Sequence, residues 1–364
     1  MIHSQKLKPR KTTKTTPKKA KSPDTIWHRR WLKWSIFGLL GVLILTQLAP
    51  VIDPLFFPPV KKVNFGVSFS AEQAKYLGLD WKENYTALLD DLKVKSFRLM
   101  SYWDTGEANR GQFDFTDLDW QVSQAAKRGA TVSLSIGIRQ PRWPECHEPS
   151  WAAQLSGNAW KQALYAYMEQ VVKRYEPSGA VTSWQLENEA MNNAFGTCPP
   201  ADRQRLIEEF ALVKSLSSKP IWMSLSDQAG LPLGAPVPDK YGFSVYRIVH
   251  GSPGGYNDYF LFPTPIWYHN VREAAIKMIQ HRDMFIHELQ LEPWGPEDVA
   301  KLSIAEQDKS MSLQQLKDNI LFARELGMSD IYGWGSEWWY WRKVKFDDPS
   351  MWNEMKHQIE TLKP

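Results

Sequence analysis

The chain has 364 residues, 18 of them tryptophan, and a formal net charge of +4. The charge is uneven, because residues 1–34 carry 11 Lys or Arg and one acid, which leaves 33 basic and 39 acidic residues in the body that follows. An acidic body lacks the basic footprint that binds nucleic-acid phosphates, so no nucleic-acid binding is expected. Its roughly 300 residues are enough for one large α/β domain.

The chain begins with a basic tail that is followed by an apolar run. Residues 1–34 are rich in Lys, Thr and Pro and bury too little apolar surface to fold, so a disordered cytoplasmic tail is expected. The run Ile36–Leu48 predicts a signal anchor, a transmembrane helix over residues 35–55. A cleavable signal peptide is the alternative. With the basic flank inside, the chain is expected to be a single-pass membrane protein whose body is periplasmic, extracellular or lumenal.

Eight short apolar or alternating runs are separated by stretches of helical periodicity along residues 60–364. Alternating strands and helices predict a parallel sheet, and the missing Gly-rich phosphate loop after the first strand disfavours an open nucleotide-binding sheet. The fold class expected is α/β, a (β/α)8 TIM barrel. The predicted strands are Val63–Phe69, Ser96–Tyr102, Thr131–Ile138, Val181–Leu186, Pro220–Leu225, Phe243–Ile248, Met284–Leu289 and Asp330–Trp334.

The helices between the strands begin at recognisable residues. Asp80 and Ser312 stand where N-caps belong. The connection between the fifth and sixth strands is the exception, because Pro232, Pro236 and Pro238 exclude a helix of ordinary length there. That crossover is expected to be irregular or very short.

Two carboxylates stand at the ends of predicted strands, where a barrel carries its chemistry. Glu189 follows the fourth strand and Glu288 lies at the end of the seventh. Cleavage of a glycosidic bond with retention needs two carboxyl groups about 5–5.5 Å apart, one to protonate the leaving oxygen and one to attack the anomeric carbon. The two residues are therefore the predicted catalytic pair, and Glu187 and Glu292 are the nearest substitutes.

Asn188-Glu189 after the fourth strand, Glu288 at the end of the seventh and the Trp-rich eighth strand resemble the clan A glycoside hydrolases, the superfamily of cellulase-like retaining enzymes. The resemblance extends over roughly residues 63–341. It implies that Glu189 is the general acid/base, that Glu288 is the nucleophile, and that Asn188 holds the sugar 2-hydroxyl.

Other side chains at strand ends are expected to bind substrate. Arg98 matches the arginine that such enzymes use to keep the nucleophile ionised, although a structural ion pair inside the barrel is the alternative. Tyr246 is placed to hydrogen-bond the nucleophile, and Trp334 with Trp338 or Trp339 would form the apolar floor beneath a pyranose. Further substrate-binding candidates are Trp143, Trp294 and Glu337.

The two cysteines of the chain, Cys146 and Cys198, follow the third and fourth strands in neighbouring loops. In an oxidising compartment they are predicted to form a disulfide, with two free thiols as the alternative. His287 has no second His or Cys at ligand spacing, and neighbouring residues on a strand point to opposite faces. No metal and no other cofactor are expected.

Together these features predict a retaining β-glycosidase that hydrolyses a β-linked oligo- or polysaccharide outside the cytoplasm, with a monomeric catalytic domain held at the membrane by the N-terminal helix. Two alternatives stay open. One is a non-catalytic glycan-binding barrel or envelope assembly protein, and the other is a transglycosylase that uses the same carboxylate pair. Sugar identity and linkage depend on loops and are not predicted.

Overall fold

A computed structural model describes residues 31–38, 41, 55, 57–60, 62–193, 195–225, 234–251, 254–258 and 265–362, in two units, 1–52 and 53–364. In the first unit, residues 31–38 are helical, and residues 1–30 of the predicted tail lie outside the described residues. Trp31, Leu32 and Trp34 make this stretch more apolar than the Lys, Thr and Pro run before it. None of the helices in these ranges has the length and apolar character to cross a bilayer, and most of the predicted anchor lies outside the described residues.

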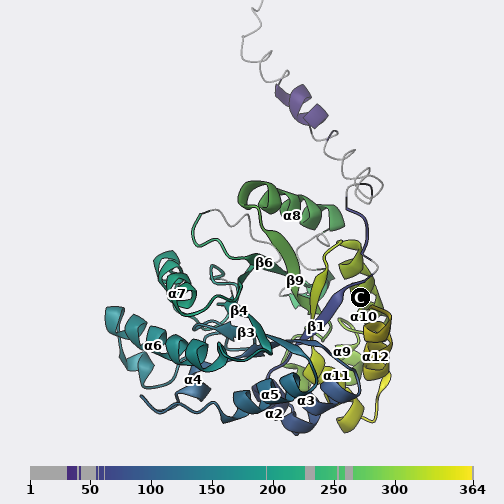
Figure 1. Cartoon of the computed structure of the whole chain (residues 1–364). Coiled ribbons are helices and arrows are strands. Elements are labelled where there is room, and N and C mark those ends of the chain that lie inside the picture. Colours follow the sequence, from purple (N-terminus) through teal and green to yellow (C-terminus); the bar gives the residue numbers. More distant parts are fainter. Residues whose placement is uncertain are drawn as a thin grey trace, which may run out of the picture. The chain divides into compact units, whose positions relative to one another are not determined.

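In the second unit, eight parallel strands close into a barrel in the order β1-β10-β9-β6-β5-β4-β3-β2 (Figure 1). The predicted TIM barrel is confirmed. The barrel strands are β1 Asn64–Ser68, β2 Ser96–Met100, β3 Thr131–Ile136, β4 Val181–Leu186, β5 Ile221–Leu225, β6 Lys240–Val245, β9 Asp283–Gln290 and β10 Asp330–Trp334.

Helices surround these strands (Figure 1). Asp80 caps α3 by accepting hydrogen bonds from two backbone N–H groups of the first turn, and Ser312 caps α10, as predicted. The helices are α2 Ala71–Tyr76, α3 Trp81–Asp90, α4 Trp103–Gly106, α5 Thr116–Lys127, α6 Gly157–Tyr175, α7 Arg203–Leu216, α8 Ile266–Gln280, α9 Ile304–Gln307, α10 Leu313–Glu325, α11 Ser336–Lys345 and α12 Ser350–Leu362, with short 3-10 turns at Ala152–Gln154 and Val299–Lys301.

The connection from β5 to β6 contains no helix in its described part, residues 234–239, as its prolines predicted. The strands themselves are neighbours and pair in parallel. After β6 the chain forms an antiparallel hairpin of β7 Ile248–Gly251 and β8 Gly255–Asp258, which the sequence analysis did not predict.

The sixth barrel strand ends at Val245, three residues before its predicted end. The reason is that Gln290 of β9 accepts hydrogen bonds through Oε1 from the N–H groups of Arg247 and Ile248, at 2.7 and 3.0 Å. These N–H groups leave the strand ladder, so Tyr246 lies just beyond the strand.

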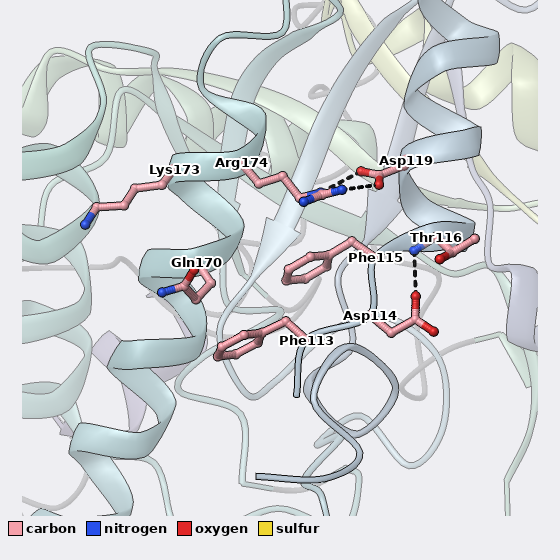
Figure 2. A pocket seen from close by; sticks show the side chains of 8 residues that line it. All are labelled: Phe113, Asp114, Phe115, Thr116, Asp119, Gln170, Lys173 and Arg174. Atoms are coloured by element: carbon pink, nitrogen blue, oxygen red, sulfur yellow. Dashed lines mark hydrogen bonds and ion pairs between the residues drawn. The ribbon is translucent and has the colours of Figure 1, made fainter. Parts of the chain in front are cut away.

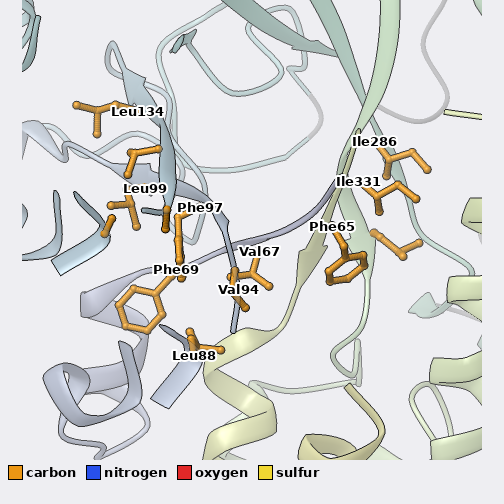
Figure 3. Close-up of a cluster of buried hydrophobic side chains, with 14 of the residues drawn as sticks. Phe65, Val67, Phe69, Leu88, Val94, Phe97, Leu99, Leu134, Ile286 and Ile331 are labelled. Carbon is orange, nitrogen blue, oxygen red and sulfur yellow. The ribbon is translucent and has the colours of Figure 1, made fainter. Parts of the chain in front are cut away.

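The core of the second unit is built from apolar side chains of the strands and of the helices packed on them (Figure 3). Phe97 and Leu99 of β2 are fully buried, and Leu88 of α3 packs into the same cluster. Because protein interiors are close-packed, such a cluster resists displacement of the strands within it. The strand ends, and the side chains they carry, are therefore held in defined places.

Candidate active site

Glu288, at the end of β9, is held by three side chains from different parts of the barrel. Its Oε1 accepts a hydrogen bond from Arg98 Nη1 at 2.8 Å, and its Oε2 accepts one from Tyr246 Oη at 2.9 Å. His287 Nδ1 lies 3.4 Å from Oε1. Burial raises the pKa of Glu288, but His287 and Arg98 lower it by more, so the pKa stays well below the ordinary 4.5. A carboxylate kept ionised in this way is suited to attack an electrophile.

A β-bulge in β9 brings His287 and Glu288 together. Ser244 of β6 pairs with Glu288 and Phe243 pairs with Ile286, so His287 is an extra residue in the ladder. The pairing of β9 with β10 shifts at the same place. Bulges interrupt the alternation of side chains and re-aim them. The expectation that neighbouring residues of this strand point to opposite faces was therefore wrong at these two positions.

Glu189 follows β4 in a backbone conformation that residues other than glycine seldom adopt, with φ of 46°. Its N–H donates to Ser224 Oγ at 2.8 Å, which supports the turn. The carboxylate accepts hydrogen bonds from Ser244 Oγ at 2.6 Å and from Asn192 Nδ2 at 2.8 Å. Unlike Glu288, Glu189 is partly exposed, so a ligand in the barrel mouth can reach it.

Ser244 connects the two carboxylates. Its Oγ donates to Glu189 and also lies 3.1 Å from His287 Nε2, while the other ring nitrogen of His287 faces Glu288. Two carboxylates that are 99 positions apart in the sequence thus share one network. Their placement agrees with the predicted pair, whereas their catalytic roles stay predictions.

Arg98 is the buried centre of this network. Besides Glu288, it donates through Nη1 to Ser68 Oγ at 3.2 Å, through Nη2 to Asn188 Oδ1 at 2.7 Å, and through Nε to Gln185 Oε1. The ion pair with Glu288 has only 1% and 6% of the two side chains exposed. The arginine is both a structural ion-pair partner and the cation beside Glu288, so the two interpretations of Arg98 do not exclude each other.

Asn188 is also buried and uses both ends of its amide within the protein. Its Oδ1 accepts from Arg98, and its Nδ2 donates to Glu145 Oε2 at 3.0 Å. The second N–H of the amide is the donor that the predicted contact between Asn188 and a sugar hydroxyl would use.

The two substitute carboxylates are occupied elsewhere. Glu187 accepts the backbone N–H groups of Ile138 and Arg139 at 3.0 and 2.6 Å and is fully buried. Glu292 forms an ion pair with Arg142 through both of its oxygens. Neither residue shares the hydrogen-bond network through Ser244 and His287 that connects Glu189 with Glu288.

The predicted apolar floor of the site is covered by protein. The Arg142 guanidinium lies 4.1 Å from the ring centre of Trp334, and Arg142 also donates to the buried Glu337 at 2.8 Å. Trp338 is 0% exposed and its indole N–H donates to Gln307, while the indole of Trp339 donates to Leu291. These findings correct the substrate-binding assignments of Trp338 and Glu337, because α11 turns both side chains into the packed interior.

A row of aromatic rings lies beside the carboxylates instead. Trp143 and Phe195 have ring centres 5.8 Å apart, Phe195 and Trp294 5.7 Å, and Trp294 and Tyr246 5.2 Å. We call these four residues the aromatic row. Its outer end is open, since Trp143 is 66% exposed, and its inner end is Tyr246, which binds Glu288. Phe195 was not predicted, because nothing in its local sequence separates it from an ordinary loop residue.

The predicted disulfide between Cys146 and Cys198 is present, with the two Cα atoms 5.2 Å apart. It joins the loop after β3 to the loop after β4. These are the loops that carry Trp143 and Phe195, so the bridge ties the outer half of the aromatic row together.

One hollow of about 440 Å³ lies on the outside of the barrel, between α5 and α6 (Figure 2). None of the predicted site residues lines it. Its main charged groups are satisfied within the protein, because Arg174 pairs with Asp119 and Asp114 accepts the N–H of Thr116 at 2.9 Å. The strand ends therefore remain the better candidate for chemistry.

Comparisons with known proteins relate this fold to glycoside hydrolases. The family "Glycosyl hydrolase family 10" matches residues 93–205, a range that includes Arg98 and Asn188-Glu189. The fold is similar to a GH5_18 protein from Bifidobacterium longum, with a TM-score of 0.53, 13% identity, and coverage of 76% of this chain and 70% of that one. Part of the chain thus matches a glycoside hydrolase family, and the whole barrel has the fold of clan A glycoside hydrolases. The resemblance noted in the sequence is confirmed.

Two further solved structures share this fold. An endo-β-1,4-xylanase of family 10 from Gloeophyllum trabeum has a TM-score of 0.50 and 14% identity, covering 76% of this chain and 87% of that one. An exo-β-1,4-mannosidase from an Opitutaceae bacterium has a TM-score of 0.51 and 15% identity, covering 76% and 53%. At this identity the shared feature is the barrel.

Replacing the outermost ring of the aromatic row tests whether it binds substrate. If the barrel cleaves glycans, Trp143→Ala should raise KM for a β-linked oligosaccharide about fivefold, because a ring–sugar contact is worth on the order of 1 kcal/mol. The kcat on a 4-nitrophenyl monosaccharide should change by less than about twofold, since the small substrate does not reach Trp143. Phe113→Ala, which removes an exposed ring at the outer hollow, is the control. Equal effects of the two variants on KM would contradict the assignment.

Proposed function

We propose that this protein is a retaining β-glycosidase that hydrolyses a β-linked oligo- or polysaccharide, with Glu288 as nucleophile and Glu189 as general acid/base. The observation that supports it best is the different surroundings of two carboxylates in one network. Glu288 is 4% exposed and held ionised by Arg98, His287 and Tyr246, whereas Glu189 is partly exposed and has only neutral hydrogen-bond donors. Environments that separate two carboxyl groups in this way suit one nucleophile and one proton carrier.

In the first step, an oxygen of Glu288 attacks the anomeric carbon while Glu189 gives its proton to the glycosidic oxygen, so the leaving group departs as an alcohol. A glycosyl ester of Glu288 remains. In the second step, Glu189 takes a proton from water, the water oxygen attacks the anomeric carbon, and Glu288 leaves as a carboxylate. Arg98 and Tyr246 hold the Glu288 oxygens in place in both steps.

The substrate class to test first is a β-1,4-linked glycan, because two of the solved barrels of this fold are named for β-1,4-xylan and β-1,4-mannosides. We also propose that the barrel works outside the cytoplasm. The Cys146–Cys198 disulfide supports an oxidising compartment, and the basic tail with its apolar run agrees with export.

The experiment is to assay the protein on 4-nitrophenyl β-glycosides of xylose, mannose, glucose and galactose and on β-1,4-linked oligosaccharides. The two roles are then separated by adding azide to alanine variants of the carboxylates. In Glu288→Ala, azide should restore activity by attacking the anomeric carbon of the substrate directly, which gives an α-glycosyl azide. In Glu189→Ala, the glycosyl ester of Glu288 should still form, and azide should attack this ester and give a β-glycosyl azide. Substitution of the exposed Glu297 by Ala is the matched control and should leave activity unchanged.

Each alternative function has its own result. A glycan that binds but is never cleaved would indicate a binding barrel and would overturn the proposal. Products longer than the substrate, detected by mass spectrometry, would indicate a transglycosylase that uses the same pair. Azide products of the opposite configurations would exchange the roles of the two carboxylates.

A further inference from the structure

We propose that Glu145 is a third carboxyl group of the active site, which positions Asn188 and hydrogen-bonds the hydroxyl at C2 of the sugar that Glu288 attacks. This inference rests on the proposed function and deepens it. The sequence analysis did not single out Glu145, which lies in the loop after β3.

Two loops hold the backbone of Glu145. Its φ is 72°, a left-handed conformation that is uncommon for this residue type, and its N–H and C=O are bonded to Arg142 and Gln140 at 2.8 and 2.7 Å. A Cβ at Gly196 would lie 2.7 Å from the Cβ of Glu145, so the loop after β4 packs directly against it. The disulfide of the adjacent Cys146 ties these two loops. Uncommon backbone held by so many contacts is typical of functional residues.

The Glu145 carboxyl joins the network through Asn188, on the side away from Glu288. Its Oε2 accepts from Asn188 Nδ2 at 3.0 Å, and Arg139 Nη2 lies 3.8 Å from the same oxygen. Asn188 accepts from Arg98, which binds Glu288. Two buried side chains therefore connect Glu145 to the proposed nucleophile.

The other oxygen of Glu145 is left for a ligand. Within the described part of the chain, nothing hydrogen-bonds to Oε1, although the residue is only 5% exposed. This oxygen is not among the fully buried polar atoms that lack a partner, so it keeps some open surface at which a donor or acceptor of a ligand can bind. Asn188, directly before Glu189, uses its Oδ1 and one of its two N–H groups on protein partners, and Glu145 Oε1 is a further polar atom beside it. Hydrogen bonds to the 2-hydroxyl strengthen in the transition state of glycoside cleavage.

The charge state of Glu145 suits this place. Burial, together with the negative charges of Glu288 and Glu189, raises the pKa of Glu145 to about 8, against the lowering by Asn188 and Arg139. At neutral pH the group is mainly the neutral acid, which can donate to the sugar without placing another anion near Glu288. As the pH rises through about 8, Glu145 ionises and loses that donor.

The test compares Glu145→Ala with Glu145→Gln on the 4-nitrophenyl β-glycoside that the wild type hydrolyses fastest and on its 2-deoxy analogue. Glu145→Ala should lower kcat/KM for the parent substrate about 10- to 100-fold, since it leaves Asn188 and the sugar hydroxyl unpaired. In this variant, the ratio of kcat/KM for the parent substrate to kcat/KM for the 2-deoxy substrate should fall toward the rate ratio of the two uncatalysed hydrolyses. Glu145→Gln keeps an acceptor for Asn188 and a donor for the sugar, so at pH 6 it should stay within about fivefold of wild type. Above pH 8 the wild type should lose activity relative to Glu145→Gln.

Glu148→Gln is the matched control, because its carboxylate lies in the same loop and binds Trp160 instead. Thermal melting identifies a variant that fails to fold, and the pH comparison on Glu145→Gln then still decides. A parent to 2-deoxy ratio in Glu145→Ala equal to that of wild type would overturn the Glu145 proposal alone, as would identical pH profiles of Glu145→Gln and wild type. If the wild type hydrolyses no glycoside at all, the proposed function fails instead.

Discussion

Glu288→Gln should lower kcat on every glycoside substrate by at least about 10⁴-fold, the scale seen when a covalent nucleophile is removed. Glutamine keeps the shape of the side chain but has no charged oxygen to attack the anomeric carbon. Tyr246 and Arg98 would remain in place around an amide that cannot form the glycosyl ester. The measurement is release of 4-nitrophenol under single-turnover conditions, together with a search for the covalent adduct by mass spectrometry of the intact protein after reaction with a 2-fluoro glycoside.

Glu292→Gln is the control for this prediction. Glu292 is a largely buried carboxylate, with 12% of its side chain exposed, and it also pairs with an arginine, Arg142, at the same end of the barrel. It should therefore lose stability to a similar degree but retain far more kcat. If both variants lose activity equally, the loss of activity would be attributed to impaired folding, and the role of Glu288 as nucleophile would be rejected.

Arg98→Leu should have the second largest effect, on activity and stability together. Removing one partner of a buried ion pair costs about 3–5 kcal/mol, because the other charge is left without compensation. Glu288 would then be buried with less positive charge near it, so its pKa should rise and it should ionise only at higher pH. We expect kcat/KM to fall and its acidic limb to move to higher pH, measured as a full pH profile.

The stability loss should depend on pH with a defined sign. In the wild type the pKa of Glu288 lies below 4.5, so its ionisation stabilises the fold fully above that value, and this contribution disappears as the pH falls toward the lowered pKa. In Arg98→Leu the ionised Glu288 is unfavourable instead. The difference in free energy of unfolding between the two proteins should therefore be largest near neutral pH and shrink below about pH 4.5.

Arg174→Leu provides the comparison for an exposed ion pair. Its partner is Asp119, and both side chains are well exposed, so the loss should be only about 0–1 kcal/mol. Denaturant titration at several pH values measures both variants. A difference between wild type and Arg98→Leu that stays constant across the acidic range would refute the coupling to Glu288.

The sequence by itself determined the barrel and the end of it at which the candidate site lies. Apolar runs of strand length alternate with helical stretches, and capping residues such as Asp80 and Ser312 mark helix starts, because these signals act over a few neighbouring residues. Since all strands of such a barrel run in parallel, residues at strand ends, such as Glu189 and Glu288, are carried to one mouth. The disulfide followed in the same way, from two cysteines in adjacent loops.

Only the tertiary structure decided which side chains meet in that mouth and which are buried. The bulge at His287 depends on how β9 pairs with β6 and β10, and the local sequence does not predict it. Trp338 was expected to face the ligand, yet packing of α11 on the barrel buries it completely. Glu145 and Phe195 come from two neighbouring loops, and the packing of these loops on each other decides where both side chains lie. Burial and pairing are set by neighbours that are distant in sequence, so the chemistry of these residues became visible only when those neighbours were in place.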